Sequence, residues 1–389
     1  MKKTTLFFIL YALGIIPLMA QNDSKEKSGS FGANNFFFAG HTAVSAAFDT
    51  GTAAIGDAGF SAVFLYKLSD KLFVESELEV ATGDGAVEVG LEHAKLVYSV
   101  CKNLNFYAGR WVPKFGMYRG RIGESFINKF ATDPVGFGDG GIGAMEETGV
   151  GAAGGLSMGP SKINYDVWVT NGPQLLTDVE NAGQFDYEAY TENNKNKAYG
   201  GRLGFLPFSN SCLELGFSFE NANNTLDQNS VYTYGKNVGV TMYALDMNFY
   251  HAINPIKSTV RISGEYKVQN VGRFDYSLVG DSIIVDDANN PGSTMQVGMP
   301  AFQNNANAWY GTISLRPSGV NNAVLRNFEV AYRYSQFSRP NDAPWGGKTL
   351  MRSTVAIDYW LKWNCVAKLC YETQTDTPNR IYAQMVYGF

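Results

Sequence analysis

The side chains with the clearest capacity for chemistry in this chain are four cations in one glycine-rich segment. The stretch GRWVPKFGMYRGRIGESF, residues 109–126, contains Arg110, Lys114, Arg119 and Arg121 and has an acidic residue only near its end. Guanidinium groups hold anions by paired hydrogen bonds, most strongly where water is partly excluded. The segment therefore predicts a constriction that attracts anions, if the rest of the chain forms a channel around it.

The same cations have a second interpretation at a membrane surface. There they would pair with lipopolysaccharide phosphates, or with the carboxylates of Glu124, Asp133 and Asp139. Ion pairs of that kind need no channel around them. The sequence leaves the constriction and the surface pairing equally open.

Four further arginines lie on predicted strands and could face the same channel: Arg202, Arg261, Arg333 and Arg380. Their predicted face also carries carboxylates, namely Glu75, Glu77, Glu79, Glu214, Glu220, Glu265 and Glu329. Carboxylates that face the same water repel an anion. The mixture predicts a general pore with a locally basic constriction.

Other kinds of site are weakly represented. The three histidines, His41, His93 and His251, fall on separate predicted strands and outside any recognisable serine or aspartate motif. An outer-membrane phospholipase or protease would need a base beside a nucleophile or an activated water, so this alternative is disfavoured and we expect no enzyme.

Metal and cofactor sites are also disfavoured. A group of oxygen ligands at Asp281, Asp286, Asp287 and Asn289 could attract Ca²⁺, but its spacing lacks the EF-hand pattern. No Walker, dinucleotide or zinc signature is present, so we expect no cofactor. The formal net charge of −5 argues against binding of nucleic acid.

The elements that would position the cations are β-strands. In the last of them, Tyr387 and Met385 share the parity of Phe389, whereas Gln384 and Arg380 lie on the opposite parity. About sixteen segments alternate in this way, which predicts an all-β, transmembrane antiparallel β-barrel with an inward-folded third loop. A soluble β-sandwich also alternates, but here charges of both signs occupy the second face of many strands.

The connections between these strands alternate in length. Seven short ones are predicted, and the eight longer or more polar ones include residues 82–87, 114–146 and 374–378. Short turns on one side and long loops on the other are typical of outer-membrane barrels. Aromatic belts at the two membrane interfaces would be formed by residues near strand ends: Tyr66, Trp111, Tyr199, Phe249, Trp309 and Phe337.

The N-terminus predicts secretion. Lys2 and Lys3 precede an apolar run that ends at Met19, so residues 1–20 are a predicted signal peptide, residues 21–34 a short N-terminal segment and residues 35–389 the barrel. The apolar run is too short for a membrane-spanning helix. We expect the mature chain in the cell outer membrane of a diderm bacterium.

A barrel of about sixteen strands is wide enough for a water-filled channel. Residues 21–34 are too few to form a folded plug. Passive diffusion of small hydrophilic solutes is therefore the expected function. A structural or adhesin barrel with a blocked lumen stays open as an alternative, as does the outer-membrane enzyme.

Three stretches resemble one family: FYAGRWVPKFGMYRG at 106–120, ETGVGAAGGLSMGPSKINYDVWVTNG at 147–172, and the terminal YAQMVYGF at 382–389. The chain resembles the phosphate-selective porins O and P and similar Bacteroidota-type porins. The resemblance implies a sixteen-stranded, homotrimeric channel with preference for anions or phosphate. Outer-membrane lipid and lipopolysaccharide would surround it, and the barrel-assembly machinery would recognise Phe389.

Overall fold

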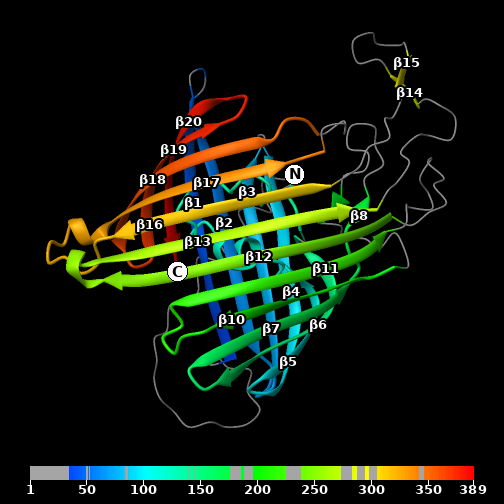
Figure 1. Ribbon diagram of the computed structural model, residues 1–389, viewed down its shortest axis with the longest axis horizontal. Coiled ribbons are helices and arrows are strands. Elements are labelled where there is room, and N and C mark those ends of the chain that lie inside the picture. Colours follow the sequence, from blue (N-terminus) through cyan, green and yellow to red (C-terminus); the bar gives the residue numbers. More distant parts are fainter. Residues whose placement is uncertain are drawn as a thin grey trace, which may run out of the picture. The chain divides into compact units, whose positions relative to one another are not determined.

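Within the residues that the structure describes, sixteen antiparallel strands close into a barrel (Figure 1). The computed structural model describes residues 35–49, 51, 53–83, 86–138, 140–143, 145–175, 185–187, 196–224, 238–272, 283–286, 294–297, 305–340 and 346–389. The predicted signal peptide, residues 1–20, and the segment 21–34 lie outside them. No helix among the described residues is long and apolar enough to cross a membrane.

The barrel strands follow one another around the sheet in chain order. They are β1 (Phe36–Phe48), β2 (Ala53–Lys67), β3 (Leu72–Gly83), β4 (Ala86–Cys101), β5 (Leu104–Trp111), β6 (Glu147–Met158), β7 (Ser161–Thr170), β10 (Ala198–Leu206), β11 (Leu213–Asn224), β12 (Val238–Ile253), β13 (Ser258–Val271), β16 (Ala306–Arg316), β17 (Phe328–Ser338), β18 (Leu350–Lys362), β19 (Cys365–Gln374) and β20 (Thr377–Gly388). Two small two-stranded sheets are not part of the barrel sheet: β8 (Gln174–Leu175) with β9 (Phe185–Asp186), and β14 (Ile283–Asp286) with β15 (Thr294–Val297).

The first and last strands close the barrel by pairing with each other. Their register runs from His41 opposite Gly388 to Phe48 opposite Ile381. The C-terminal residue extends the ladder, because the Phe389 N–H donates to the Gly40 carbonyl at 3.0 Å and the Phe389 carbonyl oxygen accepts from the Gly40 N–H at 3.1 Å. Closure leaves every barrel strand with a partner on both sides, as hydrocarbon surroundings demand.

The two faces of the strands differ in the way the sequence predicts. On β11, Leu215 and Phe217 are exposed, whereas Glu214, Ser218 and Glu220 are buried. The other strands with clear alternation behave alike, for example Val330 and Tyr332 on β17. An apolar exposed face and a polar buried face are the reverse of a soluble β-sandwich and fit a barrel surrounded by lipid.

Two of the connections predicted to be longer are in fact tight turns. Strand β3 ends at Gly83 and β4 begins at Ala86, while β19 ends at Gln374 and β20 begins at Thr377. The second turn contains Asp376 with φ of 60°, a left-handed conformation that Asp tolerates better than most residues. The polar, turn-forming residues there indicated longer loops, but pairing of the flanking strands continues almost to their tips.

The terminal aromatic ring gives a first prediction. The ring of Phe389 stacks on Phe38 and Phe60, with centroids 5.2 and 5.7 Å apart. We expect Phe389→Ala to lower the free energy of unfolding in urea by about 1–3 kcal/mol, less than a fully buried phenylalanine because the ring is 38% exposed. Phe37→Ala, at a ring 60% exposed on the same sheet, is the control and should cost less than about 1 kcal/mol. Equal losses would contradict the stacking role.

Candidate functional site

The connection from β5 to β6, residues 112–146, lies against the buried faces of many strands; we call it the β5–β6 segment. Its Gly116 amide donates to Ser218 of β11 at 3.0 Å. Thr132 donates to Glu372 of β19 at 2.6 Å and its carbonyl accepts from Arg333 of β17 at 2.8 Å. The segment therefore contacts strands far apart in the chain and around the barrel.

The firmest attachment is to β13. Glu265 accepts the amide N–H groups of Met117 and Tyr118 at 2.8 and 2.7 Å. Lys267 lies 3.4 Å from the Glu265 carboxylate and donates to the carbonyl of Ile142 at 3.1 Å. Because both ends of the segment bond this ion pair, it fixes the segment at two points.

Glycine is required next to this attachment. Gly116 has φ of +77°, and a Cβ on it would lie 1.8 Å from the Glu265 carboxylate oxygen. Any other residue would strain the backbone and displace the carboxylate. The glycine therefore lets the backbone approach Glu265 closely enough for the two amide bonds.

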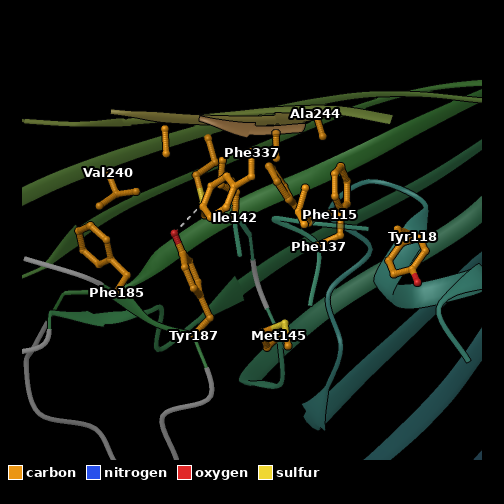
Figure 2. Packing of buried hydrophobic residues seen from close by; sticks show 14 of the residues in the cluster. Phe115, Tyr118, Phe137, Ile142, Met145, Phe185, Tyr187, Val240, Ala244 and Phe337 are labelled. Atoms are coloured by element: carbon orange, nitrogen blue, oxygen red, sulfur yellow. Dashed lines mark hydrogen bonds between the residues drawn. The ribbon is translucent and has the colours of Figure 1, made fainter. Parts of the chain in front are cut away.

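An apolar cluster holds the same segment (Figure 2). Phe115, Phe137 and Ile142 of the segment pack with Val240 and Phe337 of the barrel wall. Further members are Trp111, Tyr118, Val135, Met145, Trp168, Phe185, Tyr187, Met242, Ala244, Val271, Ala306, Ala308 and Tyr310. Part of the buried barrel face is thus apolar and filled by side chains, which the alternation of polar residues did not predict.

Two predicted interface aromatics belong to this cluster instead. Trp111 is 3% exposed and Phe337 is 6% exposed, so their assignment to aromatic belts is wrong. Both lie near strand ends, as predicted, but on the face that turns toward the β5–β6 segment. Position along the strand could be predicted from the sequence, whereas the face depended on packing against a distant segment.

The four cations predicted to form the constriction each lie near a carboxylate. Lys114 lies 2.9 Å from Asp166 of β7, and Arg119 lies 3.4 Å from Glu146. Arg121 donates through one nitrogen to both oxygens of Glu214 at 2.8 Å. The ion pairs of Lys114, Arg119, Arg121 and Arg110 are formed within the barrel protein.

A π-helical turn, Tyr118–Ile122, carries two of these cations. Arg119 and Arg121 are two residues apart on it and therefore point to different carboxylates, Glu146 and Glu214. Such turns are rare and occur often at functional sites. Arg110, at the end of β5, lies 3.9 Å from Glu146, which it shares with Arg119.

Arg202 of β10 joins the same group. It donates to Asp246 of β12 at 2.6 and 3.1 Å and to Glu214 at 3.1 Å. Sequence analysis identified Glu214 but missed Asp166, Asp246 and Glu146. Asp246 lies between exposed Leu245 and Met247, so the alternation of β12 held a usable signal.

The remaining predicted cations lie elsewhere. Arg333 is buried, and its guanidinium carbon lies 4.3 Å from the ring centroid of Phe130 in the β5–β6 segment. Arg261 is exposed on β13, four residues before Glu265. Arg380 of β20 lies 3.7 Å from Asp49. The structure therefore brings Arg110 and Arg119 to Glu146, Arg121 and Arg202 to Glu214, and Lys114 to Asp166, and it leaves Arg261 and Arg380 apart.

Two polar cavities border the segment. One of about 420 Å³ lies toward the short turns and includes Lys114, Arg121 and Arg202 in its lining. Another of about 450 Å³ lies toward the long connections and includes Asp133, Arg339 and Arg352. The segment therefore leaves open space next to charged side chains toward both ends of the strands.

The histidines do not assemble a catalytic group. His93 lies 3.0 Å from Glu77, and the hydroxyl of Ser61 donates to the same carboxylate at 2.5 Å rather than to the imidazole. His41 lies 3.9 Å from Glu124, and His251 stacks on Phe249. No serine oxygen is placed to give its proton to a histidine among these contacts.

Among the side chains that the structure describes, no group of three or more His, Cys, Asp or Glu residues is placed so that it could hold a metal ion. The predicted group at Asp281, Asp286, Asp287 and Asn289 falls outside these side chains, as does the predicted partner Asp139.

Comparison with solved structures finds outer-membrane porins and channels with this fold. The outer-membrane channel DcaP of Acinetobacter baumannii has 13% identity and a TM-score of 0.55, with 93% of this chain and 100% of that chain covered. Salmonella typhi OmpF in complex with daunomycin has 11% identity and a TM-score of 0.54, covering 91% and 98%. The anion-selective porin from Comamonas acidovorans has 12% identity and a TM-score of 0.50, covering 91% and 99%.

These likenesses establish the fold. At such low identity they do not transfer a solute or a selectivity to this chain. No family model and no curated protein matches the sequence. The resemblance to the phosphate-selective porins O and P therefore stays a prediction.

Removal of the β13 attachment should loosen the segment. Glu265→Ala leaves two amide N–H groups and the buried Lys267 ammonium without this partner. We expect a loss of about 3–5 kcal/mol in the free energy of unfolding and faster proteolysis between residues 112 and 146. The double variant Glu265→Ala, Lys267→Met should recover part of the loss. Glu88→Ala, at an exposed site on β4, is the control; an equal loss there would contradict the attachment role.

Glu124 of the segment gives a pH-dependent prediction. Partial loss of water around its carboxyl group, together with the carboxylates of Glu77 and Glu79, raises the pKa of Glu124 from 4.5 to about 7. The folded state then holds a proton that the unfolded state releases, so stability falls as the pH rises between these values. As the pH rises from about 5 to about 8, the free energy of unfolding of Glu124→Gln should increase relative to that of wild type. The increase should be less than about 2 kcal/mol, because the side chain is half exposed.

Urea unfolding of both proteins at the two pH values measures this difference. His41→Gln, next to Glu124, is a useful control because it removes the nearby imidazole and keeps the carboxyl. An identical pH dependence for wild type and Glu124→Gln would contradict the assignment.

Proposed function

We propose that the chain is an outer-membrane porin, a water-filled channel for passive diffusion of small hydrophilic solutes. The observation that carries the proposal is the charged buried face of a closed sixteen-stranded barrel, with polar cavities on both sides of the β5–β6 segment. Charged side chains on that face require water or paired partners, because unpaired charges are costly in an apolar environment. The fold shared with solved porins supports this function.

The β5–β6 segment is the proposed constriction of this channel. Its contacts with β7, β11, β13, β17 and β19 support a path across the enclosed space rather than along the outside of the barrel. The apolar cluster would fill one side of the lumen. Solutes would then pass beside the charged part of the segment, where Lys114, Arg119 and Arg121 lie.

The proposed ion preference is a weak one for anions. Lys114 and Arg121 are 48% and 37% exposed, whereas their partners Asp166 and Glu214 are each 6% exposed. A solute in the lumen would meet the cations before the carboxylates. Because each cation has a carboxylate partner, strong selectivity for phosphate is not part of the proposal.

The surroundings of the channel follow from the same proposal. The apolar exposed face fits lipid and lipopolysaccharide of the outer membrane, reached after removal of residues 1–20 as a signal peptide. We further propose a homotrimer, and recognition of Phe389 by the barrel-assembly machinery during insertion. Neither a cofactor nor catalysis is part of the proposal.

Ion selectivity in planar bilayers tests the proposed function. Under a KCl gradient, wild type should conduct and its reversal potential should indicate a small excess of chloride permeability. Arg119→Ala with Arg121→Ala should move the potential toward cation preference, because Glu146 and Glu214 then lose cationic partners. Lys348→Ala, an exposed cation paired with Asp376, is the control and should leave the potential unchanged.

Absence of conductance in wild type would contradict the channel and favour a blocked, structural barrel. Cation preference in wild type would leave the channel standing but overturn the basic constriction.

A further inference from the structure

The cavity toward the short turns has the properties of a solute site; we call it the β7 cavity. Asn105 lies near the start of β5 and Asn164 near the start of β7, so the cavity is next to the turns at 102–103 and 159–160. Its volume is about 420 Å³. Its polar lining comes from Asn105, Lys114, Arg121, Asn164, Asp166 and Arg202.

Glycines on β10 and β11 make room for polar side chains beside this cavity. A Cβ on Gly204 would lie 2.2 Å from the side-chain oxygen of Asn164, and one on Gly216 would lie 2.2 Å from the carboxylate of Asp246. Without these Cβ atoms, Asn164 and the Arg202–Asp246 pair can lie along the wall.

Charges around the cavity balance, but they are not equally accessible. Lys114, Arg121 and Arg202 are bonded to Asp166, Glu214 and Asp246, respectively. The first two cations are 48% and 37% exposed, while their carboxylate partners are 6% exposed. A bound solute therefore meets donor groups at the front and carboxylates at the back.

This arrangement favours a monoanion over a dianion. Attraction to a charge-balanced site grows in proportion to the charge of the solute, whereas the cost of removing the solute from water grows with the square of its charge. Inorganic phosphate is mainly a dianion above its second pKa, so its entry should cost more hydration, relative to the attraction gained, than entry of a monoanion. A carboxylate still accepts the paired hydrogen bonds that a guanidinium favours, and as a monoanion it loses less hydration than phosphate does.

The amides extend recognition beyond the charge. The Asn105 side chain can both donate to and accept from a hydroxyl group. The Lys114 ammonium carries three N–H donors, and its nitrogen lies 2.9 Å from a carboxylate oxygen of Asp166. A hydroxylated solute can therefore use the lining more fully than a simple carboxylate.

We propose that the β7 cavity binds a small monocarboxylate that carries hydroxyl groups. The inference rests on the proposed function, because the solute would reach the cavity through the lumen. It deepens that function by naming a solute class that differs from phosphate.

Sodium gluconate is the probe, with sodium phosphate at equal ionic strength as the comparison. In planar bilayers, gluconate should lower the chloride conductance in a saturable way, at lower concentration than phosphate does. Lys114→Gln or Arg121→Gln should raise the half-blocking gluconate concentration about tenfold, the effect of one charge-assisted hydrogen bond. Lys162→Gln, an exposed lysine on the same strand β7, is the matched control and should have no effect.

Both test variants should fold, since Tyr107 still donates to Asp166 and Arg202 still donates to Glu214. Ala153→Met is a second variant, which fills the cavity without changing charge and should also weaken the block. Stronger block by phosphate, or equal gluconate block in wild type and Arg121→Gln, would overturn the inference.

Calorimetric titration of gluconate into the detergent-solubilised protein separates the two proposals. Binding that Arg121→Gln abolishes would support the site even if no current were seen, in which case the channel alone would fail. Conductance in wild type without gluconate binding would leave the channel and overturn the site.

Discussion

Pairing of every barrel strand on both sides is the constraint on which the rest of this structure depends. Hydrocarbon offers no partner for free N–H and C=O groups, so the sheet must close, and β1 meets β20 to close it. Closure gives each strand one exposed and one enclosed face. The strict alternation of side chains then places charges such as Glu265 and Arg202 in the enclosed space.

Those enclosed charges explain why the β5–β6 segment is both polar and apolar. Buried ions are costly unless they are paired, so Glu265 and Lys267 pair with each other and with backbone groups of the segment. Phe115 and Phe137 meanwhile cover the apolar part of the wall. What remains is the charged side of the segment, and the proposed solute path lies there because its ion pairs stay partly exposed.

Much of the fold could be predicted from the sequence, because a period of two is local. Phe389 and the strand before it indicated the barrel, and the strand number and short turns follow from the same pattern. The two tight turns at Gly83 and Asp376 were missed, since turn residues give the place of a connection better than its length. Among site residues, Lys114 and Arg121 were identified, but Asp166 and Asp246 were not. The alternation of β12 indicates the face of Asp246, whereas the pairing of both carboxylates depends on contacts between distant segments.

The most direct measurement is solute entry into liposomes that contain the purified protein. The rate at which the liposomes swell in solutions of neutral sugars measures the width of an open path, and it does not depend on charge. The account predicts rapid entry of pentoses and hexoses, with rates that fall steeply as the sugar becomes larger, because the β5–β6 segment is the proposed constriction. Liposomes that admit none of these sugars, with the barrel shown to be folded and inserted, would contradict a water-filled channel.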